Sequence, residues 1–481
     1  MIVIITYQDL LLRGDNENDR MQFVHSLIQK HKSTDIYEQA VIAAEYAKQQ
    51  NRTIMWFQKL LYTMSGEAVP DNFSANYKLC SNFFYKFITQ ETQFLLGNGV
   101  SWQGNGGEQM GKDFDNKLQE AGYEALVGGV SFGFWNLDHL EVFKITEFAP
   151  LYDEENSALM AGVRFWQIDN DKPLRATLYE IDGYTEYIWR KRKNPKTSAD
   201  ETYGEIFHEK RPYKLKIKAT PADGEQIYDG ENYPTFPIVP LWGNQHKQSA
   251  LVGLRSEIDA YDLIRSGFAN DVDDASQIYW TIQNAGGMDD VDLAKFVERL
   301  KTVKAATVED DGARAESHTV EVPYASRETL LTRLRADMYE DAMALDTRDI
   351  AGGATTATQI RAAYEPLNSK TDHFEYQIGL FLDRLLLVAG VEDEYSFTRS
   401  TIINISEEVN TVLSAAEYLT DDYITEKILT ILGDGDRVEE ILKQIDADEL
   451  ERGGVIDSGT VYEPTGESVG AENNTGISTG V

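Results

Sequence analysis

A change of hydrophobic period constrains the fold more than any other feature of the sequence. Between residues 121 and 240 the chain has short runs rich in β-branched and aromatic residues, and the turn signal Asp182-Gly183 joins two of them. On both sides of that region, apolar residues recur every three or four positions, as on one face of an amphipathic helix. The sequence therefore predicts an α+β protein, mainly helical, with an antiparallel sheet region between helical parts.

Two helical blocks precede the sheet region. Residues 17–66 are expected to be helical, with Thr34-Asp35 capping one of the helices. A second helix is expected over residues 76–99, where Gly97-Asn98-Gly99 is a stop signal. Cys80 is the single cysteine, which excludes an intramolecular disulfide. Within a helix, we expect it to be a small core residue.

The charge balance is strongly acidic. The chain has 481 residues and a formal net charge of −35, so copies repel one another and any closed assembly needs apolar contacts. Such a surface also argues against ordinary tight binding of nucleic acid. The basic run RKRKNPK, residues 190–196, is expected in a solvated loop at one hairpin end, with a contact to nucleic acid or an acidic partner as the alternative.

No segment reaches the roughly 20 apolar residues that span a bilayer. The apolar start MIVIITYQDLLL lacks the basic region of a signal peptide. We therefore expect synthesis and assembly in the cytoplasm and no membrane partner.

Two long helices enclose a small insert in the second half of the chain. The first is expected over residues 249–277, with one apolar face and acidic residues elsewhere. The insert, residues 278–326, is expected to hold a strand-like piece at each end, IYWTI and HTVEVPY, around the helix DVDLAKFVERLKTV. A returning helix is predicted over residues 327–346.

A stretch of small residues, DIAGGATTATQIRAAYEPL, follows the returning helix and leads into a third helix, from about Thr356 to Gly390. Pro366 lies inside that helix. It removes the hydrogen bond to the carbonyl of Ala362 and is expected to bend the helix there. Residues 406–451 are predicted to be helical and acidic, and the tail after Gly453 has the composition of a disordered segment.

Motifs that carry chemistry are nearly missing from the sequence. There is no phosphate-binding GxxxxGK[ST] loop, no GxSxG nucleophile motif and no histidine pair at metal-ligand spacing. The glycine run GNGVSWQGNGG, residues 97–107, follows a helix rather than a strand, so it is a weak candidate for a dinucleotide loop. The acidic pairs Asp273-Asp274, Asp289-Asp290 and Asp310-Asp311 are expected to be solvated surface, with Mg²⁺ binding as the alternative. The sequence thus predicts a protein that is not an enzyme and has no cofactor and no metal.

The order of these parts resembles that of a tailed-bacteriophage portal protein, of the kind found in siphophages that infect Gram-positive bacteria. The resemblance covers roughly Tyr37 to Glu451 and is carried by four stretches. They are AEYAKQQNRTI, NYKLCSNFFYKFITQETQFLLGNG, FPIVPLWGNQHKQSALVGLRSEIDAYDLIRSGFAND and IAGGATTATQIRAAYEPLNSKTDHFEYQIGLFLDRLL.

The resemblance implies a portal fold, with an α/β wing, a helical stem, a small α/β clip, a helical crown and assembly into a ring. The implied modules are the wing at 1–248, the first stem helix at 249–277, the clip at 278–326, the second stem helix at 327–346, the tunnel loop at 347–356, the kinked wing helix and its connection at 357–404, the crown at 405–452 and a disordered tail at 453–481.

For function, the resemblance implies a ring of twelve subunits at one capsid vertex of the virion, assembled in the host cytoplasm. Double-stranded viral DNA would pass through the central channel during packaging and ejection. The implied partners are the large subunit of the terminase motor, a head-completion or adaptor protein, and the major capsid and scaffolding proteins. The alternatives are another ring-forming head–tail adaptor, which is usually smaller, and an uncharacterised hydrolase built on the sheet region.

The resemblance also gives candidate site residues. The tunnel loop and its flanks would meet DNA or a neighbouring subunit through Arg348, Asp349, Gly352, Gly353, Ala354, Thr355, Thr356 and Gln359. The alternative for this loop is a plain connection between helices, with Thr356 or a neighbour as the N-cap. The acidic stem residues Asp271, Asp273 and Asp274 would line the channel and keep a duplex sliding. The basic clip residues Lys295, Arg299, Lys301, Lys304 and Arg314 would meet the motor or DNA, with a mixed-charge solvated surface as the alternative.

Overall fold

The computed structural model forms two compact units, Met1–Thr401 and Ile402–Val481, and each is considered by itself. The residues that it describes are 5–14, 16–62, 65–71, 74–193, 200–219, 227–275, 279–283, 314–318, 324–348, 357–400, 409, 412–432, 437–438 and 441–445.

The first unit opens with four helices, α1 (Tyr7–Leu11), α2 (Glu17–Lys32), α3 (Asp35–Ala47) and α4 (Arg52–Trp56). Thr34 caps α3 as predicted, because its side chain accepts a hydrogen bond from the Tyr37 amide. The helical prediction for residues 17–66 is wrong at its C-terminal end. There, strands β1 (Leu60–Tyr62) and β2 (Ala68–Pro70) form an antiparallel hairpin. Gly66, with φ of +82°, supplies the left-handed backbone of its turn.

Helix α5 spans Phe83–Leu96, so the prediction of a helix over residues 76–99 is wrong for residues 76–82. The amides of Tyr77, Leu79 and Ser81 donate to side chains of another helix, α8 (Arg255–Ala275), instead of to carbonyls one turn back. Cys80 therefore lies outside a helix and is only half-buried, which corrects its expected place in the core. Burial still raises the pKa of its thiol.

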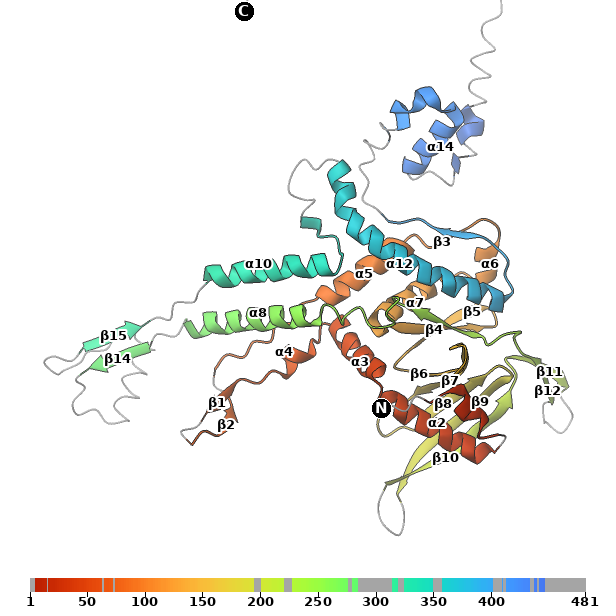
Figure 1. Ribbon diagram of the computed structural model, residues 1–481, viewed down its shortest axis with the longest axis horizontal. Coiled ribbons are helices and arrows are strands. Elements are labelled where there is room, and N and C mark those ends of the chain that lie inside the picture. The colour runs from red at the N-terminus through yellow and green to blue at the C-terminus, as the bar shows by residue number, and fades with distance from the viewer. Residues whose placement is uncertain are drawn as a thin grey trace, which may run out of the picture. The chain divides into compact units, whose positions relative to one another are not determined.

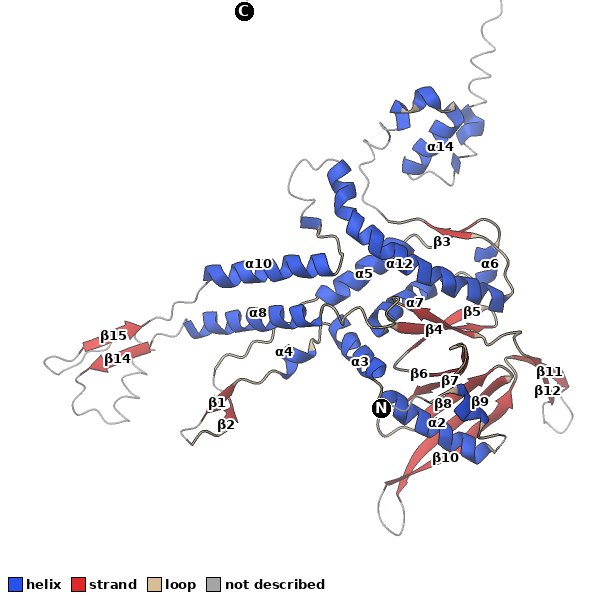
Figure 2. Ribbon diagram, viewed as in Figure 1, coloured by secondary structure: helices blue, strands red, loops and turns tan. Residues whose placement is uncertain are grey.

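The predicted antiparallel sheet region is confirmed and contains separate sheets (Figure 2). Helices α6 (Gly106–Met110) and α7 (Phe114–Gly128) precede it, so the sheet region begins at residue 130 rather than 121. One sheet has the order β13-β4-β5, with β4 at Val130–Asn136, β5 at His139–Lys144 and β13 at Ile238–Trp242. A five-stranded sheet has the order β10-β9-β8-β7-β6, with β6 at Phe148–Tyr152, β7 at Leu159–Trp166, β8 at Leu174–Glu180, β9 at Gly183–Lys193 and β10 at Asp200–Arg211.

Two short strand pairs complete the β structure of this region and its neighbourhood. Strands β11 (Lys214–Ala219) and β12 (Ile227–Glu231) pair with each other. Strand β3 (Val100–Trp102) pairs with β16 (Tyr395–Phe397), which joins the first half of the chain to residues after the long helix α12 (Ala357–Ala389).

The hairpin at Asp182-Gly183 forms as predicted, with Glu180 opposite Gly183 at the end of the β8–β9 pair. Gly183 has a φ of +136°, a conformation that favours glycine. The basic run at 190–196 was expected in a loop, but its first four residues continue β9 and pair with β10. The Arg190 side chain forms an ion pair with Glu205 on β10. The remaining residues of that run, 194–196, lie outside the described residues.

The main core lies around the β13-β4-β5 sheet. Helix α7 packs against β4 and β5, while α12 packs against β13 and β4. Gly133 of β4 permits a close approach, since a Cβ atom there would lie 2.4 Å from the ring of Phe381 on α12. A second core forms where α2 covers the larger sheet, through residues such as Val24, Val163 and Leu178. The packing of α12 against β13 and β4 fixes this helix across the body of the first unit.

The predicted long helices are present with shifted ends. The first begins at Arg255 rather than near residue 249, because residues 250–254 form turns and the Ser249 hydroxyl accepts from the Leu251 amide. The returning helix, α10, spans Tyr324–Asp341 instead of residues 327–346. The third helix, α12, matches its prediction, and Gly390 follows it with φ of +74°.

The insert between α8 and α10 contains the hairpin β14 (Tyr279–Gln283) with β15 (Arg314–His318). The first strand lies where it was predicted. The second was expected at His318–Tyr324. Strand β15 includes His318, opposite Tyr279, residues 319–323 lie outside the described residues, and Tyr324 begins α10. The helix predicted over residues 290–303 lies outside the described residues.

The second unit is helical where it is described, with the 3₁₀ turn η1 at Ala416–Tyr418 and α14 at Asp421–Leu432. Ile424 is buried within it. The tail predicted to be disordered, residues 453–481, lies outside the described residues. In the part of the chain that the structure describes, no helix combines the length and the apolar character that crossing a bilayer needs.

Candidate functional site

Helices α8 and α10 lie side by side and antiparallel (Figure 1). Near one end of the pair, the rings of Phe268 and Tyr324 meet edge to face with centroids 5.5 Å apart. The guanidinium of Arg327 lies over Phe268, with its carbon 5.8 Å from the ring centroid, and forms an ion pair with Asp271. Aromatic and ionic contacts therefore join the two helices near the insert.

The three acidic residues predicted to line a channel differ in their surroundings. Asp271 is half-buried and paired with Arg327, so its charge is partly balanced. Asp273 is exposed. Asp274 belongs to α8, and its side chain is outside what the structure describes. Sequence reasoning missed the ion pair because its partners are on different helices, and helical periodicity carries no information about such contacts.

At the other end of the pair, two carboxyl groups face each other across the helices. Glu257 of α8 lies within reach of Asp341 of α10, and a hydrogen bond between two carboxyl groups requires one of them to be protonated. Burial, that hydrogen bond and the charges of Asp341 and Asp337 raise the pKa of Glu257 to about 7. The raised pKa of Glu257 places its change of charge near neutral pH.

A row of polar side chains on α8 holds the segment at residues 77–81. Asn270 accepts from the Tyr77 amide at 2.7 Å, and Ser266 accepts from the Leu79 amide at 3.0 Å. Asp262, which is 0% exposed, accepts from the Ser81 amide at 2.8 Å and also from the side-chain amide of Asn51. Because residues 262, 266 and 270 are spaced by four, they lie on one face of the helix. This spacing is visible in the sequence, but the sequence does not show that the three side chains bind the amides of residues 77–81.

The segment before the predicted tunnel loop is held by α5 and α10. Gln90 of α5 both donates to the Leu345 carbonyl, at 3.1 Å, and accepts from the Leu345 amide, at 3.0 Å. Arg335 of α10 binds both carboxylate oxygens of Asp346, at 2.8 and 2.9 Å. Arg348 follows, with an exposed side chain and an amide that donates to Asp346.

A small apolar cluster brings together the two sides of that loop. Leu345, which precedes the loop, is buried with Phe94, Tyr364 and Leu367, and the last two belong to α12. The rings of Phe94 and Tyr364 are stacked with centroids 5.7 Å apart. The predicted loop residues Asp349, Gly352, Gly353, Ala354, Thr355 and Thr356 lie outside the described residues. Gln359, on the first turn of α12, is exposed.

Pro366 lies inside α12 and immediately precedes the buried Leu367. In Figure 1 the N-terminal turns of α12 run at an angle to the rest of the helix. A proline inside a helix lacks the N–H of its turn, so a bend at Pro366 remains a prediction. Farther along, Lys370 forms an ion pair of 2.6 Å with the buried Glu91 of α5. Burial nevertheless raises the pKa of Glu91.

Of the basic residues predicted to dock a motor, Lys295, Arg299, Lys301 and Lys304 lie outside the described residues. Arg314 is the first residue of β15, and nothing is described of its side chain. Of these five predicted residues, only the backbone of Arg314 has a described contact, opposite Gln283 in the β14–β15 hairpin.

The glycine run at residues 97–107 meets a carboxylate of the chain itself. The amides of Gly104 and Gly106 donate to Asp393, at 2.9 and 2.7 Å. Such amides are the groups that a phosphate would use, and here they hold an internal acid. Among the described residues, no group of three or more His, Cys, Asp or Glu side chains is arranged to hold a metal ion. Of the acidic pairs, Asp289-Asp290 and Asp310-Asp311 are outside that set.

The comparisons with known proteins place the chain in the class of bacteriophage portal proteins. Residues 16–451 match the family described as phage portal protein, SPP1 Gp6-like. Because the match covers most of the chain, the protein belongs to this family.

Two named relatives agree with this assignment. The chain is 24% identical to the portal protein of Bacillus phage SPP1 over 387 residues, which is 74% of this chain and 73% of that protein. It is 28% identical to the portal protein of Clostridium phage phiCD119 over 221 residues, which is 44% of this chain and about half, 49%, of that protein. The resemblance inferred from the sequence is confirmed. Among solved structures, a chain from the neck of an empty gene transfer agent particle is similar with a TM-score of 0.41 and 11% identity. The match covers 73% of this chain and 90% of the other. The low TM-score adds nothing to the family assignment.

Proposed function

We propose that this chain is the subunit of a portal ring at one vertex of a phage capsid, through which double-stranded DNA enters and leaves. The observation that carries the proposal is membership of the SPP1 Gp6-like portal family over residues 16–451. The match over most of the chain favours a portal protein over a smaller head–tail adaptor. It equally favours a structural component over a hydrolase.

The paired helices α8 and α10 are the proposed wall of the channel, and α8 with its acids is the proposed lining. At −35 per chain, twelve copies carry a formal charge of 12 × −35, or −420. A duplex carries about one negative charge per 1.7 Å of its axis, so a basic wall would grip it while an acidic wall keeps it centred. Asp273, which is exposed, and Asp271, which is half-buried and paired with Arg327, are the described acidic residues proposed for this role.

Residues 347–356 are the proposed tunnel loop, at the narrowest point of the channel. The anchors on both sides support this role: Leu345 is bound to α5, and Tyr364 packs in the same apolar cluster. The small residues Gly352 to Thr356 allow several copies to approach one duplex without clashes. Arg348 and Gln359, both exposed at the ends of the loop, are the proposed contacts to DNA or to the next subunit.

The remaining modules are proposed with the boundaries that the sequence suggested. Residues 1–248 form the wing, 278–326 the clip, 357–404 the bent helix that returns to the wing, and 405–452 the crown. The clip would dock the large terminase subunit and then a head-completion protein, through basic residues such as Lys295 and Arg314. The wing would face the major capsid and scaffolding proteins. The protein would be assembled in host cytoplasm and retained in the virion.

The mass of the purified assembly tests the ring. Twelve chains of 54.3 kDa give 12 × 54.3, or about 652 kDa, and native mass spectrometry together with negative-stain images should show a closed ring of about this mass with a central hole. A protein that stays monomeric at micromolar concentration, with or without hydrolytic activity, would contradict the proposal.

A further inference from the structure

Residues 55–70, called the arm, expose an unusual number of large apolar side chains. They include the end of α4 and the β1–β2 hairpin, which Figure 1 shows as a separate ribbon beyond α4. Seven of these side chains are more than 40% exposed: Met55, Trp56, Phe57, Leu60, Leu61, Tyr62 and Val69. A two-stranded hairpin is marginally stable on its own in water. Such an exposed apolar surface is typical of a site that another protein covers.

The charge of the arm is unlike that of the chain. Its ionisable residues are Lys59 and Glu67, so its formal charge is zero in a chain of −35. A neutral apolar segment can approach a second copy of this acidic protein without the general repulsion between copies.

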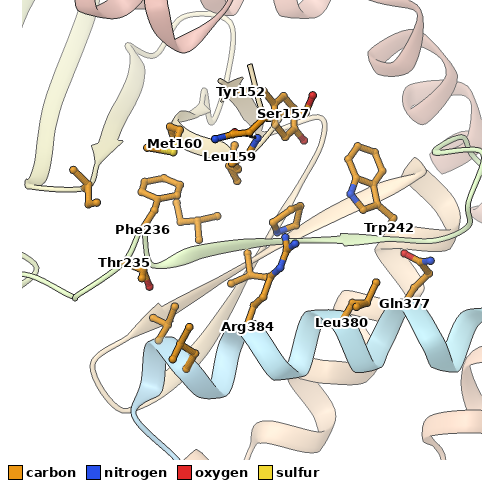
Figure 3. A pocket seen from close by; sticks show the side chains of 18 of the residues that line it. Tyr152, Ser157, Leu159, Met160, Thr235, Phe236, Trp242, Gln377, Leu380 and Arg384 are labelled. Atoms are coloured by element: carbon orange, nitrogen blue, oxygen red, sulfur yellow. Dashed lines mark hydrogen bonds between the residues drawn. The ribbon is translucent and has the colours of Figure 1, made fainter. Parts of the chain in front are cut away.

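A groove elsewhere on the first unit has complementary properties (Figure 3). It has a volume of about 980 Å³ and lies between α12, β13 and the turn that joins β6 to β7. Figure 3 shows Leu380 and Arg384 rising from α12 toward Tyr152 and Leu159 on the opposite strands, with Trp242 at one end. The volume is at the upper end of the range in which proteins bind compact apolar groups.

The groove is free of acids. Of the twenty residues that line it, none is Asp or Glu, although the chain has 80 such residues. Its charged lining residues are Arg384, which is exposed, and Lys247, whose ammonium lies 4.6 Å from the centroid of the Trp242 ring. An apolar, positively charged groove fits an apolar segment that carries a carboxylate.

We infer that the arm of one copy binds in the groove of the next copy, with its apolar side chains against Leu380 and Leu387 and Glu67 beside Arg384. Arm and groove share no element, so each copy offers both surfaces and the contact is head to tail, which is the type of interface that closes into rings. The inference rests on the proposed ring assembly and names one of its contacts. Leu387 is 65% exposed in the single chain and would become buried.

Disulfide trapping tests the contact directly. In a Cys80→Ser background, Leu61→Cys combined with Leu387→Cys should give, after mild copper–phenanthroline oxidation, a ladder of covalent oligomers up to the size of the ring. Two single-cysteine variants, when mixed, should give only covalent dimers, because each subunit then has one thiol. The control pairs Leu61→Cys with Ile168→Cys, since Ile168 is 86% exposed and lies outside the groove, and it should give no ladder.

The outcomes separate this contact from the ring itself. If negative stain shows rings but oxidation gives no Leu61–Leu387 ladder, the inference is overturned and the proposed function stands. An equal ladder from the Ile168 control has the same consequence. Absence of rings from the wild-type protein would count against both.

A charge exchange gives an independent measure. Arg384→Glu should raise the protein concentration needed for assembly by about tenfold, because it places two acids together in a desolvated contact. Adding Glu67→Arg to the same chain should restore assembly. If Arg384→Glu assembles like the wild type, the proposed pairing is wrong.

Discussion

Single polar residues decide where elements of this protein begin and end. Asp262 is fully buried, and burial raises the pKa of its carboxyl even though Asn51 and the Ser81 amide donate to it. Together with Ser266 and Asn270 it binds the segment before α5 in a non-helical form. These contacts override the helical periodicity of that segment, which by itself predicted a helix.

Asp262→Ala should lower the free energy of unfolding by about 3 kcal/mol, because it leaves two buried donors without an acceptor. Asp262→Asn should cost less, since its amide oxygen still accepts one of the bonds. Urea unfolding followed by tryptophan fluorescence gives both values. Asp171→Ala, an exposed control in a surface turn, should change stability by less than about 0.5 kcal/mol. Equal losses for Asp262→Ala and this control would refute the anchoring role.

Glu257 should make stability depend on pH near neutrality. Its pKa is about 7 in the folded protein and about 4.3 in an unfolded chain, so between these values the folded state binds more protons. The stabilising contribution is therefore fully present below about pH 4.3 and is lost as pH rises through 7. The difference in Tm between pH 5.5 and pH 8 should be smaller for Glu257→Gln than for the wild type. Glu340→Gln, on the exposed side of α10, should keep the wild-type difference.

Elements with a regular period were predictable from the sequence, and elements fixed by distant partners were not. The alternating strands, the Asp182-Gly183 hairpin and the extent of α12 follow from local pattern and turn chemistry. The non-helical segment before α5 depends on hydrogen bonds to residues far along the chain, and the start of α8 depends on the turns at residues 250–254. For the same reason, the sequence indicated Asp271 as a candidate site residue by its residue type, but it did not show that Arg327 is the ion-pair partner of Asp271.

At the scale of elements, a prediction follows from the apolar cluster on both sides of the proposed tunnel loop. Leu367→Ala should cost about 3 kcal/mol of stability, since Leu367 is 2% exposed and packs with Phe94 and Leu345. By loosening the anchors of the loop it should also lower DNA packaging in an in vitro assay. Leu330→Ala, at an exposed position on α10, is the matched control and should leave both quantities nearly unchanged. A stable, fully packaging Leu367→Ala protein would argue against the anchor.

The proposed role of residues 347–356 as a tunnel loop is tested by stiffening this segment. Gly353→Pro, or a shortened loop, should leave ring assembly intact but reduce the length of DNA packaged, because the loop would lose the backbone freedom that glycine provides. Full-length packaging by either variant would count against a moving loop.

For the whole molecule, the proposed role of the acidic charge is to let DNA pass through the channel without binding tightly. Neutralising Asp271, Asp273 and Asp274 to Asn should slow packaging and ejection and increase DNA retention at low salt. Asp271→Asn also releases Arg327 from its ion pair, so this single change should have a larger effect than Asp273→Asn. Equal rates for the triple variant and the wild type would remove the support for an acidic, low-adhesion channel.

The central claim is that this chain closes into a ring whose channel is lined by the α8–α10 pair. A cryo-electron microscopy reconstruction of the purified full-length protein tests it most directly. We predict a closed ring of about twelve subunits in which α8 and α10 surround the central hole and residues 347–356 point into it. Monomers, or a ring in which these helices lie at the outer rim, would contradict the account.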